Sequence, residues 1–118
     1  MEVLDDAYNS NVEGARDAVE VLRLFEGEKY IVTPGIVELG ALEEEENKKF
    51  GAQLTGLNVI LVGETLVRAV RDGYLQAGGD ESKIMTVPTL KAAQAVLAES
   101  LRPGDCVLFL NDLPDVYS

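Results

Sequence analysis

The chain contains no histidine, no tryptophan and only one cysteine in 118 residues. Without histidine, imidazole general-base catalysis and Ser-His-Asp triads are excluded, as is any zinc site that needs an imidazole ligand. A single cysteine cannot form a disulfide within the chain and cannot build a multi-cysteine metal site. These absences exclude histidine-based catalysis and a zinc site, and we assign no catalytic residue and no metal site to this chain.

Basic residues are also scarce, with 10 lysines and arginines against 21 aspartates and glutamates and a formal net charge of −11. A surface this negative repels phosphate backbones and anionic membrane surfaces, so we expect neither nucleic acid nor membrane as a partner. Long apolar runs are missing, and Glu2, Asp5 and Asp6 stand where a signal peptide would have a basic start. These features predict a cytoplasmic protein.

The chain does contain a regular alternation of short β-type runs and amphipathic helical patterns, and its length predicts a single domain over residues 1–118. The predicted strands are Glu2–Asp6, Lys29–Thr33, Asn58–Val62, Lys83–Val87 and Cys106–Leu110. The predicted helices are Val12–Phe25, Leu42–Leu54, Glu64–Gln76 and Thr89–Leu101. Strict alternation favours parallel strands joined by right-handed crossovers. We therefore predict an α/β fold, a Rossmann-like doubly wound sheet of five mainly parallel strands with helices on both faces.

The second predicted helix is unusually polar. Its expected inner positions are Leu42, Phe50 and Leu54. The run Glu43–Glu46 falls in its first turns, where carboxylates suit the helix dipole, and the two lysines that follow can pair with these glutamates at i, i+4. We interpret the four glutamates as a solvated helix start rather than as a metal site.

Ligands of doubly wound sheets bind at the carboxyl ends of the strands. The loop after the first predicted strand carries Asp6, Tyr8, Asn9, Ser10 and Asn11, which suit a ribose, a phosphate or a carboxylate at a helix N-terminus. A plain N-cap formed by Ser10 or Asn11 is the alternative. After the last strand, residues 111–115 are either a ligand loop or a solvated tail. The chain has neither a Gly-x-Gly-x-x-Gly fingerprint nor a P-loop, so it cannot build a P-loop nucleotide site by itself.

The run Asp6-Ala7-Tyr8-Asn9-Ser10-Asn11 resembles the start of the C-terminal domain of the Mur ligase family, where an Asp-x-Tyr-Asn-Ala-Asn-Pro stretch precedes a helix. Weaker matches follow in the family's order at Val37–Gly40, Leu61–Gly63 and Gly104–Phe109. Four departures stand out. Val12 replaces the usual proline, and Thr33–Val37 replaces a Gly-Asp-Met lead-in to the second motif. Asn47 stands where a histidine is common in the following helix, and Asn111–Pro114 replaces a Lys-Gly-Ser-Arg run after the last strand.

The resemblance implies one domain of an ATP-dependent ligase of peptidoglycan precursor synthesis. Enzymes of this family use ATP and Mg²⁺ to convert a carboxylate to an acyl phosphate, which an incoming amine attacks. The implied partners are the central ATP-binding and N-terminal UDP-sugar domains of the same parent chain, together with small-molecule substrates. ATP and Mg²⁺ are expected in the full-length enzyme and neither in the isolated domain.

By the same resemblance, the expected nucleotide-binding residues are Asp6, Tyr8 and Asn9. The expected substrate-binding residues are Asn11, Glu38, Leu39, Gly40, Asn111 and Asp112, the last two because they follow the final strand at the ligand end of the sheet.

We expect the isolated chain to fold, to have no ligase activity and to bind nucleotide very weakly. A stand-alone acidic α/β binding module without ATP chemistry is the alternative that the residues leave open. A response-regulator-like receiver is disfavoured, because Val62-Gly63 stands where that fold needs an aspartate at the end of the third strand.

Overall fold

The computed structural model describes residues 2–6, 12–36, 40–64 and 66–110. In this part of the chain, five strands form one parallel sheet in the order β1-β5-β2-β3-β4. The strands are β1 (Glu2–Asp6), β2 (Lys29–Thr33), β3 (Asn58–Val62), β4 (Ile84–Val87) and β5 (Cys106–Leu110). The predicted fold class is confirmed. β4 begins one residue later than predicted, because residues 81–83 form a 3-10 turn, η2 (Glu81–Lys83).

The α-helices are α1 (Val12–Arg23), α2 (Glu43–Ala52), α3 (Val67–Gln76) and α4 (Leu90–Ser100), and a 3-10 turn, η1 (Gly40–Leu42), precedes α2. The prediction of Leu42 as an inner position is wrong, because its side chain is 55% exposed. Leu42 lies in η1, whose tighter winding breaks the 3.6-residue period assumed for it. α3 starts later than predicted because Gly63, at φ +101°, turns the chain after β3. Within the described residues, no helix has the length and apolarity needed to span a membrane.

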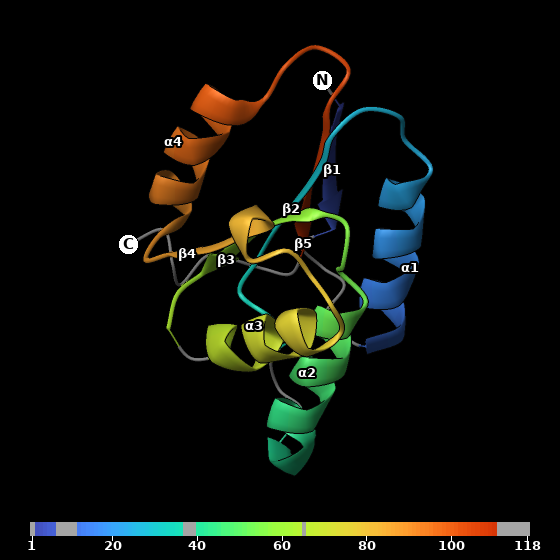
Figure 1. Ribbon diagram of the computed structural model, residues 1–118, viewed down its shortest axis with the longest axis vertical. Helices are drawn as coiled ribbons and strands as arrows, with labels where there is room; N and C mark the ends of the chain where they lie inside the picture. The colour runs from blue at the N-terminus through green and yellow to red at the C-terminus, as the bar shows by residue number, and fades with distance from the viewer. Residues whose placement is uncertain (1, 7–11, 37–39, 65, 111–118) are drawn as a thin grey trace.

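The helices cover both faces of the sheet, three on one side and one on the other. The connections β1 to β2, β2 to β3 and β3 to β4 all run in one direction across the sheet. The connection from β4 to β5 runs back in the other direction. Right-handed crossovers therefore place α1, α2 and α3 on one face and α4 on the opposite face. Figure 1 shows α1 and α4 flanking the strands.

The buried side chains of the strands alternate between these two layers, as the period of a β-strand requires. Ile31, Val59 and Leu108 pack in one cluster with α1, α2 and α3. Their neighbours along the strands, Val32, Ile60 and Val107, pack in a second cluster with Leu90, Ala93 and Leu97 of α4. The sheet thus separates two apolar cores.

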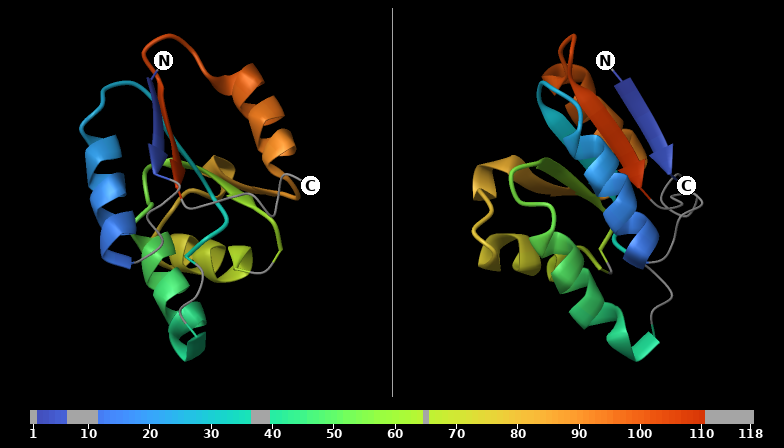
Figure 2. Two further views of the ribbon diagram at one scale, coloured as in Figure 1. Left: turned by 180° about the vertical axis from the view of Figure 1, so that it is seen from behind. Right: turned by 90° about the vertical axis from the view of Figure 1, so that its right-hand side faces the viewer.

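α2 and α3 pack backbone against backbone, and both views in Figure 2 show them side by side. A Cβ atom at Gly51 of α2 would collide with the carbonyl oxygen of Val70. A Cβ atom at Gly73 of α3 would in turn collide with the carbonyl oxygen of Lys48. The two glycines therefore set the distance between the helices.

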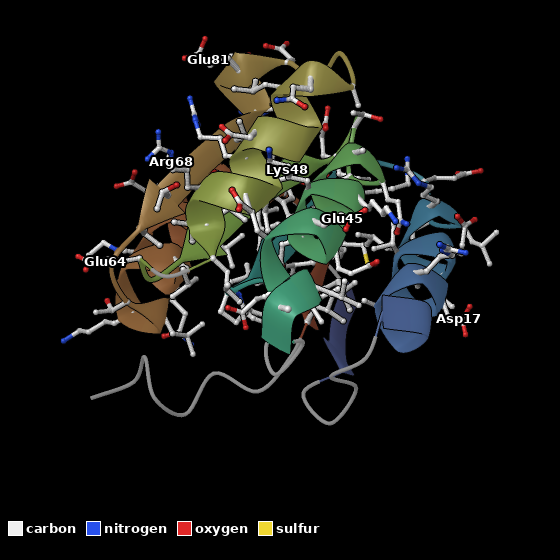
Figure 3. The ribbon with its side chains drawn as sticks, turned by 90° about the horizontal axis from the view of Figure 1, so that it is seen from below. Asp17, Glu45, Lys48, Glu64, Arg68 and Glu81 are labelled. Atoms are coloured by element: carbon white, nitrogen blue, oxygen red, sulfur yellow. The ribbon has the colours of Figure 1, made fainter. Side chains whose placement is uncertain are left out.

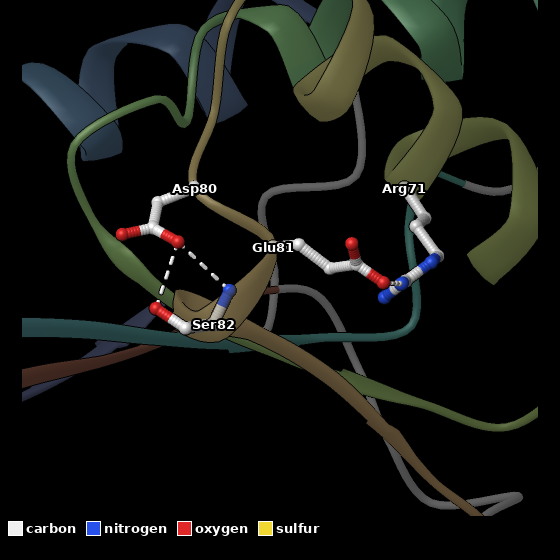
Figure 4. A network of polar contacts seen from close by, with 4 residues as sticks. All are labelled: Arg71, Asp80, Glu81 and Ser82. Carbon is white, nitrogen blue, oxygen red and sulfur yellow. Dashed lines mark hydrogen bonds and ion pairs between the residues drawn. The ribbon is translucent and has the colours of Figure 1, made fainter.

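A small polar network joins α3 to the start of β4 at the amino end of the sheet (Figure 4). Asp80 Oδ1 accepts hydrogen bonds from the Ser82 amide at 2.9 Å and from Ser82 Oγ at 2.7 Å. Arg71 pairs with Glu81 at 3.2 Å. The hydrogen bonds from Ser82 hold the pKa of the Asp80 carboxyl below its ordinary value of 3.8. The network shapes η2 on the edge opposite the predicted ligand loops.

We predict that Gly51→Ala and Gly73→Ala each destabilise the domain by about 2–3 kcal/mol, because neither helix backbone can retreat from the added methyl group. The matched control is Gly78→Ala, since a Cβ at Gly78 meets nothing within 4 Å and only the left-handed φ of +94° opposes it. That control is expected to cost about 1 kcal/mol. Urea unfolding midpoints measure the difference, and equal losses at positions 51 and 78 would contradict the glycine contact.

We predict that Asp80→Ala lowers stability at neutral pH and that the difference from wild type shrinks in acid. The folded-state pKa of Asp80 is depressed, so its contribution is present above the ordinary value of 3.8 and is lost as pH falls through the folded-state pKa. Urea unfolding across this pH range measures it, with the exposed Asp17→Ala on α1 as control. If the loss of unfolding free energy in Asp80→Ala is the same at every pH, the stabilisation does not come from the ionised Asp80 carboxylate.

Candidate functional site

The strand order brings three chain segments together at the carboxyl edge of the sheet. Asp6, the last residue of β1, is the register partner of Leu110, the last residue of β5. On the other side of β5, Val32 is the partner of Phe109, so Thr33 at the end of β2 is level with Leu110. Adjacent strands lie about 4.8 Å apart, which puts all three exits within about 10 Å of one another.

Two of the predicted site residues lie among the described residues. Asp6 ends β1 at this edge, and Gly40 is the first residue of η1. The others lie outside the described residues: Tyr8, Asn9, Asn11, Glu38, Leu39, Asn111 and Asp112. Residues 7 and 111 directly follow Asp6 and Leu110, so the first and last predicted loops leave the sheet from neighbouring strands.

The exit of β2 is tightly built. Thr33 is fully buried, and its Oγ1 accepts a hydrogen bond from the Gly35 amide at 3.1 Å. Gly35 has a φ of +96°, and a Cβ atom there would lie 2.9 Å from both Asn47 Oδ1 and Leu66 Cβ. The backbone after β2 therefore passes between α2 and the start of α3, and only glycine fits this passage.

Asn47 of α2 is fully buried and bonds to the chain on both sides of residues 37–42. Its Oδ1 accepts a hydrogen bond from the Ile36 amide at 2.7 Å. Its Nδ2 donates to the carbonyl oxygens of Ile36 at 2.9 Å and Glu43 at 2.8 Å. Sequence reasoning missed Thr33, and it noted Asn47 only as standing where the resembled family commonly has a histidine, without giving it a role. Asn47 follows four glutamates and precedes two lysines, so nothing in the local pattern points it inward.

The exits of β3 and β4 meet at a second point of the same edge. The Gly63 amide donates to the Val87 carbonyl oxygen at 2.9 Å. Beyond this bond the two connections leave toward opposite faces, one to α3 and the other to α4, whose first turn is capped by Thr89 Oγ1 accepting from the Ala92 amide at 3.1 Å. Such a reversal is where ligands commonly bind in open α/β sheets.

The charged side chains of α2 and α3 face solvent. Figure 3 shows Glu45 and Lys48 on α2 and Arg68 on α3 at the surface of this side of the molecule. Lys49 pairs with Glu45 at 3.7 Å, as predicted, and also with Glu46 at 3.5 Å. Among the described residues, no three histidine, cysteine, aspartate or glutamate side chains are grouped so that they could hold a metal ion.

In a comparison with protein-family models, the chain matches the Mur ligase, glutamate ligase domain over residues 1–111. A search of curated proteins found no match. Among solved structures, the MurF ligase from Thermotoga maritima in complex with ADP superimposes with a TM-score of 0.77 at 26% identity over 92% of this chain.

Two further structures share the fold. MurF from Acinetobacter baumannii has a TM-score of 0.67 at 23% identity, over 93% of this chain. A domain of a Haemophilus ducreyi protein described as a UDP-N-acetylmuramate:L-alanyl-γ-D-glutamyl-meso-diaminopimelate ligase has a TM-score of 0.58 at 12% identity, over 93% of this chain and 78% of its own length. By contrast, the chain spans only 24% of each MurF ligase.

Proposed function

Because the chain belongs to the Mur ligase family and forms its C-terminal domain, we propose that it works in an ATP-dependent ligase of peptidoglycan precursor synthesis. In this role it closes over the nucleotide and presents the incoming amino acid or dipeptide. The family match over residues 1–111 is the observation that carries the proposal. The row formed by the ends of β1, β5 and β2 supports it, because the predicted nucleotide and substrate loops leave the sheet there.

The remaining parts of the enzyme belong to the same parent chain in this proposal. A domain spanning 24% of a MurF ligase leaves room for a central ATP-binding domain and an N-terminal UDP-sugar domain. Bound ATP with Mg²⁺ supplies the phosphoryl group that activates the acceptor carboxylate, and the present domain binds and orients. The proposed site of action is the cytoplasm, and the isolated domain is proposed to be inactive and to bind neither ATP nor Mg²⁺ appreciably.

The donor set at the β1 exit fits the sugar and base of a nucleotide better than its phosphates. Asp6, Tyr8 and Asn9 offer a carboxylate, a phenol and an amide, which hydrogen-bond to hydroxyl groups and ring nitrogens. A domain with a net charge of −11 repels a polyphosphate. The cations that hold the phosphates therefore come from the rest of the enzyme.

The substrate-side residues suit an incoming amine. Glu38 and Asp112 offer carboxylates to an ammonium group, while Asn11 and Asn111 offer amides that both donate and accept hydrogen bonds. When the domain closes with these residues facing the reacting groups, it would exclude water from the reaction. Asn111–Pro114 contains no lysine or arginine, so the carboxylate of the incoming substrate is proposed to find its cation elsewhere.

We predict that the full-length protein containing residues 1–118 turns over ATP to ADP continuously only when ATP, a UDP-sugar peptide and an amine substrate are all present. Single amino acids and D-alanyl-D-alanine, offered in parallel, identify the amine. The protein with this domain deleted is expected to show no ligation, because the amine is no longer oriented. Ligation that persists after the deletion would overturn the proposal. A parent chain with no nucleotide-binding domain would favour the stand-alone binding module.

We predict that Asp6→Asn weakens binding of ATP and that Glu38→Gln weakens binding of the amine. Loss of one charge-assisted hydrogen bond corresponds to about tenfold in affinity, so Asp6→Asn is expected to raise KM for ATP about tenfold and Glu38→Gln to raise KM for the amine by a similar factor. The matched controls, Asp17→Asn and Glu20→Gln, lie on the exposed side of α1, and Asp17 points away from the body of the molecule in Figure 3. Equal effects on both KM values in both variants would refute the assignment.

A further inference from the structure

We propose that Asn47 is a positioning residue that fixes the two ends of the segment between β2 and α2, and thereby sets the affinity of the substrate-side edge for the incoming amine. The second half of this inference rests on the proposed function. The first half stands on the contacts of Asn47 alone.

The hydrogen bonds of Asn47 are arranged as a bridge. The amide reaches Ile36 through both of its polar atoms, at 2.7 Å from the backbone amide and 2.9 Å from the carbonyl oxygen. The same Nδ2 reaches the Glu43 carbonyl oxygen at 2.8 Å, one turn back on its own helix. Ile36 is the last described residue before 37–39, and Glu43 is the first residue of α2. One side chain therefore holds both ends of this stretch of chain at a fixed separation.

Burial makes this bridge strong. Asn47 and Ile36 are both fully buried, so water cannot replace a lost hydrogen bond. An asparagine amide supplies an acceptor and a two-hydrogen donor at one point, which matches one backbone N–H and two carbonyl oxygens. An apolar side chain of similar size could make none of these three hydrogen bonds.

Asn47 also lies against the backbone at the exit of β2 and, through it, against the start of α3. Gly35 leaves so little space beside Asn47 Oδ1 that a Cβ atom would lie 2.9 Å away, and Leu66, just before α3, closes the other side at the same distance. A shift of Asn47 therefore moves the backbone after β2 and presses on the start of α3. The residue lies behind the candidate edge and acts through these backbones, without touching a ligand itself.

The test compares Asn47→Ala with Phe50→Leu in the full-length protein. Phe50 lies on the same helix, is 2% exposed and packs in the main core, so its truncation loosens α2 without cutting the bridge. Two readouts are used: hydrogen exchange of the Ile36 amide, and KM and kcat with ATP, a UDP-sugar peptide and D-alanyl-D-alanine as the amine.

In Asn47→Ala we expect the Ile36 amide to exchange about tenfold faster than in Phe50→Leu, the change expected from losing one buried hydrogen bond. We also expect KM for the amine to rise about tenfold while kcat changes less than about threefold, since only binding geometry is lost. Equal Ile36 exchange in the two variants, or an unchanged KM beside the faster exchange, would overturn the proposal.

Two further results separate the possible failures. If the wild-type protein does not ligate, the proposed function fails, and the Ile36 exchange still decides whether Asn47 anchors the segment. If Asn47→Ala does not fold, the wild-type protein gives the answer. The Ile36 amide should then be as protected as the amides of α2, and an Ile36 amide that exchanges freely beside a protected α2 refutes the bridge.

Discussion

The pairing of β5 between β1 and β2 is the constraint on which the rest of the structure depends. β1 pairs with β5, and β5 pairs in turn with β2. Among the described residues, the first strand therefore pairs with the last strand alone, and the helix α1 must span the width of β5 to connect β1 to β2. β5 is buried almost throughout its length, and its alternating side chains pack into the apolar cores on both faces of the sheet. The same pairing aligns the ends of β1, β5 and β2 in one row.

The elements of the fold could be predicted from periodicity, but their spatial order could not. The apolar runs at residues 58–62 and 106–110 identify buried strands whatever their neighbours are. Periodicity carries no information on which strand lies beside which, and local pairing would favour β1 beside β2. The rule that ligands bind at the carboxyl ends of the strands, together with the resemblance in the loops, indicated the candidate edge. The structure added that Asp6, Thr33 and Leu110 end neighbouring strands, which turns three loops distant in sequence into one edge.

The residues missed by sequence reasoning share a physical reason. The described inner face of α2 is formed by Asn47, Phe50 and Gly51, of which only the phenylalanine is a large apolar residue. An apolar stripe this narrow gives little hydrophobic signal, so the prediction took the helix to be held by Leu42, Phe50 and Leu54. Phe50 and Leu54 are buried as predicted, and backbone contact at Gly51 and the amide of Asn47 hold the helix where Leu42 was expected to do so. Neither a glycine nor an asparagine within a charged run gives a sequence signal for such a packing role.

These contacts couple the candidate edge at the exit of β2 to the helix layer formed by α2 and α3. The reciprocal glycines leave α2 and α3 no room to slide closer, and Asn47 ties α2 to the backbone leaving β2. Gly35, held between Asn47 and Leu66, ties the same backbone to the start of α3. α4 packs in the other core, on the opposite face of the sheet. A displacement of the ligand-side backbone therefore propagates into the α2–α3 pair before it reaches α4. Substitutions at the helix contact should consequently be felt at the β2 exit even though they lie behind it.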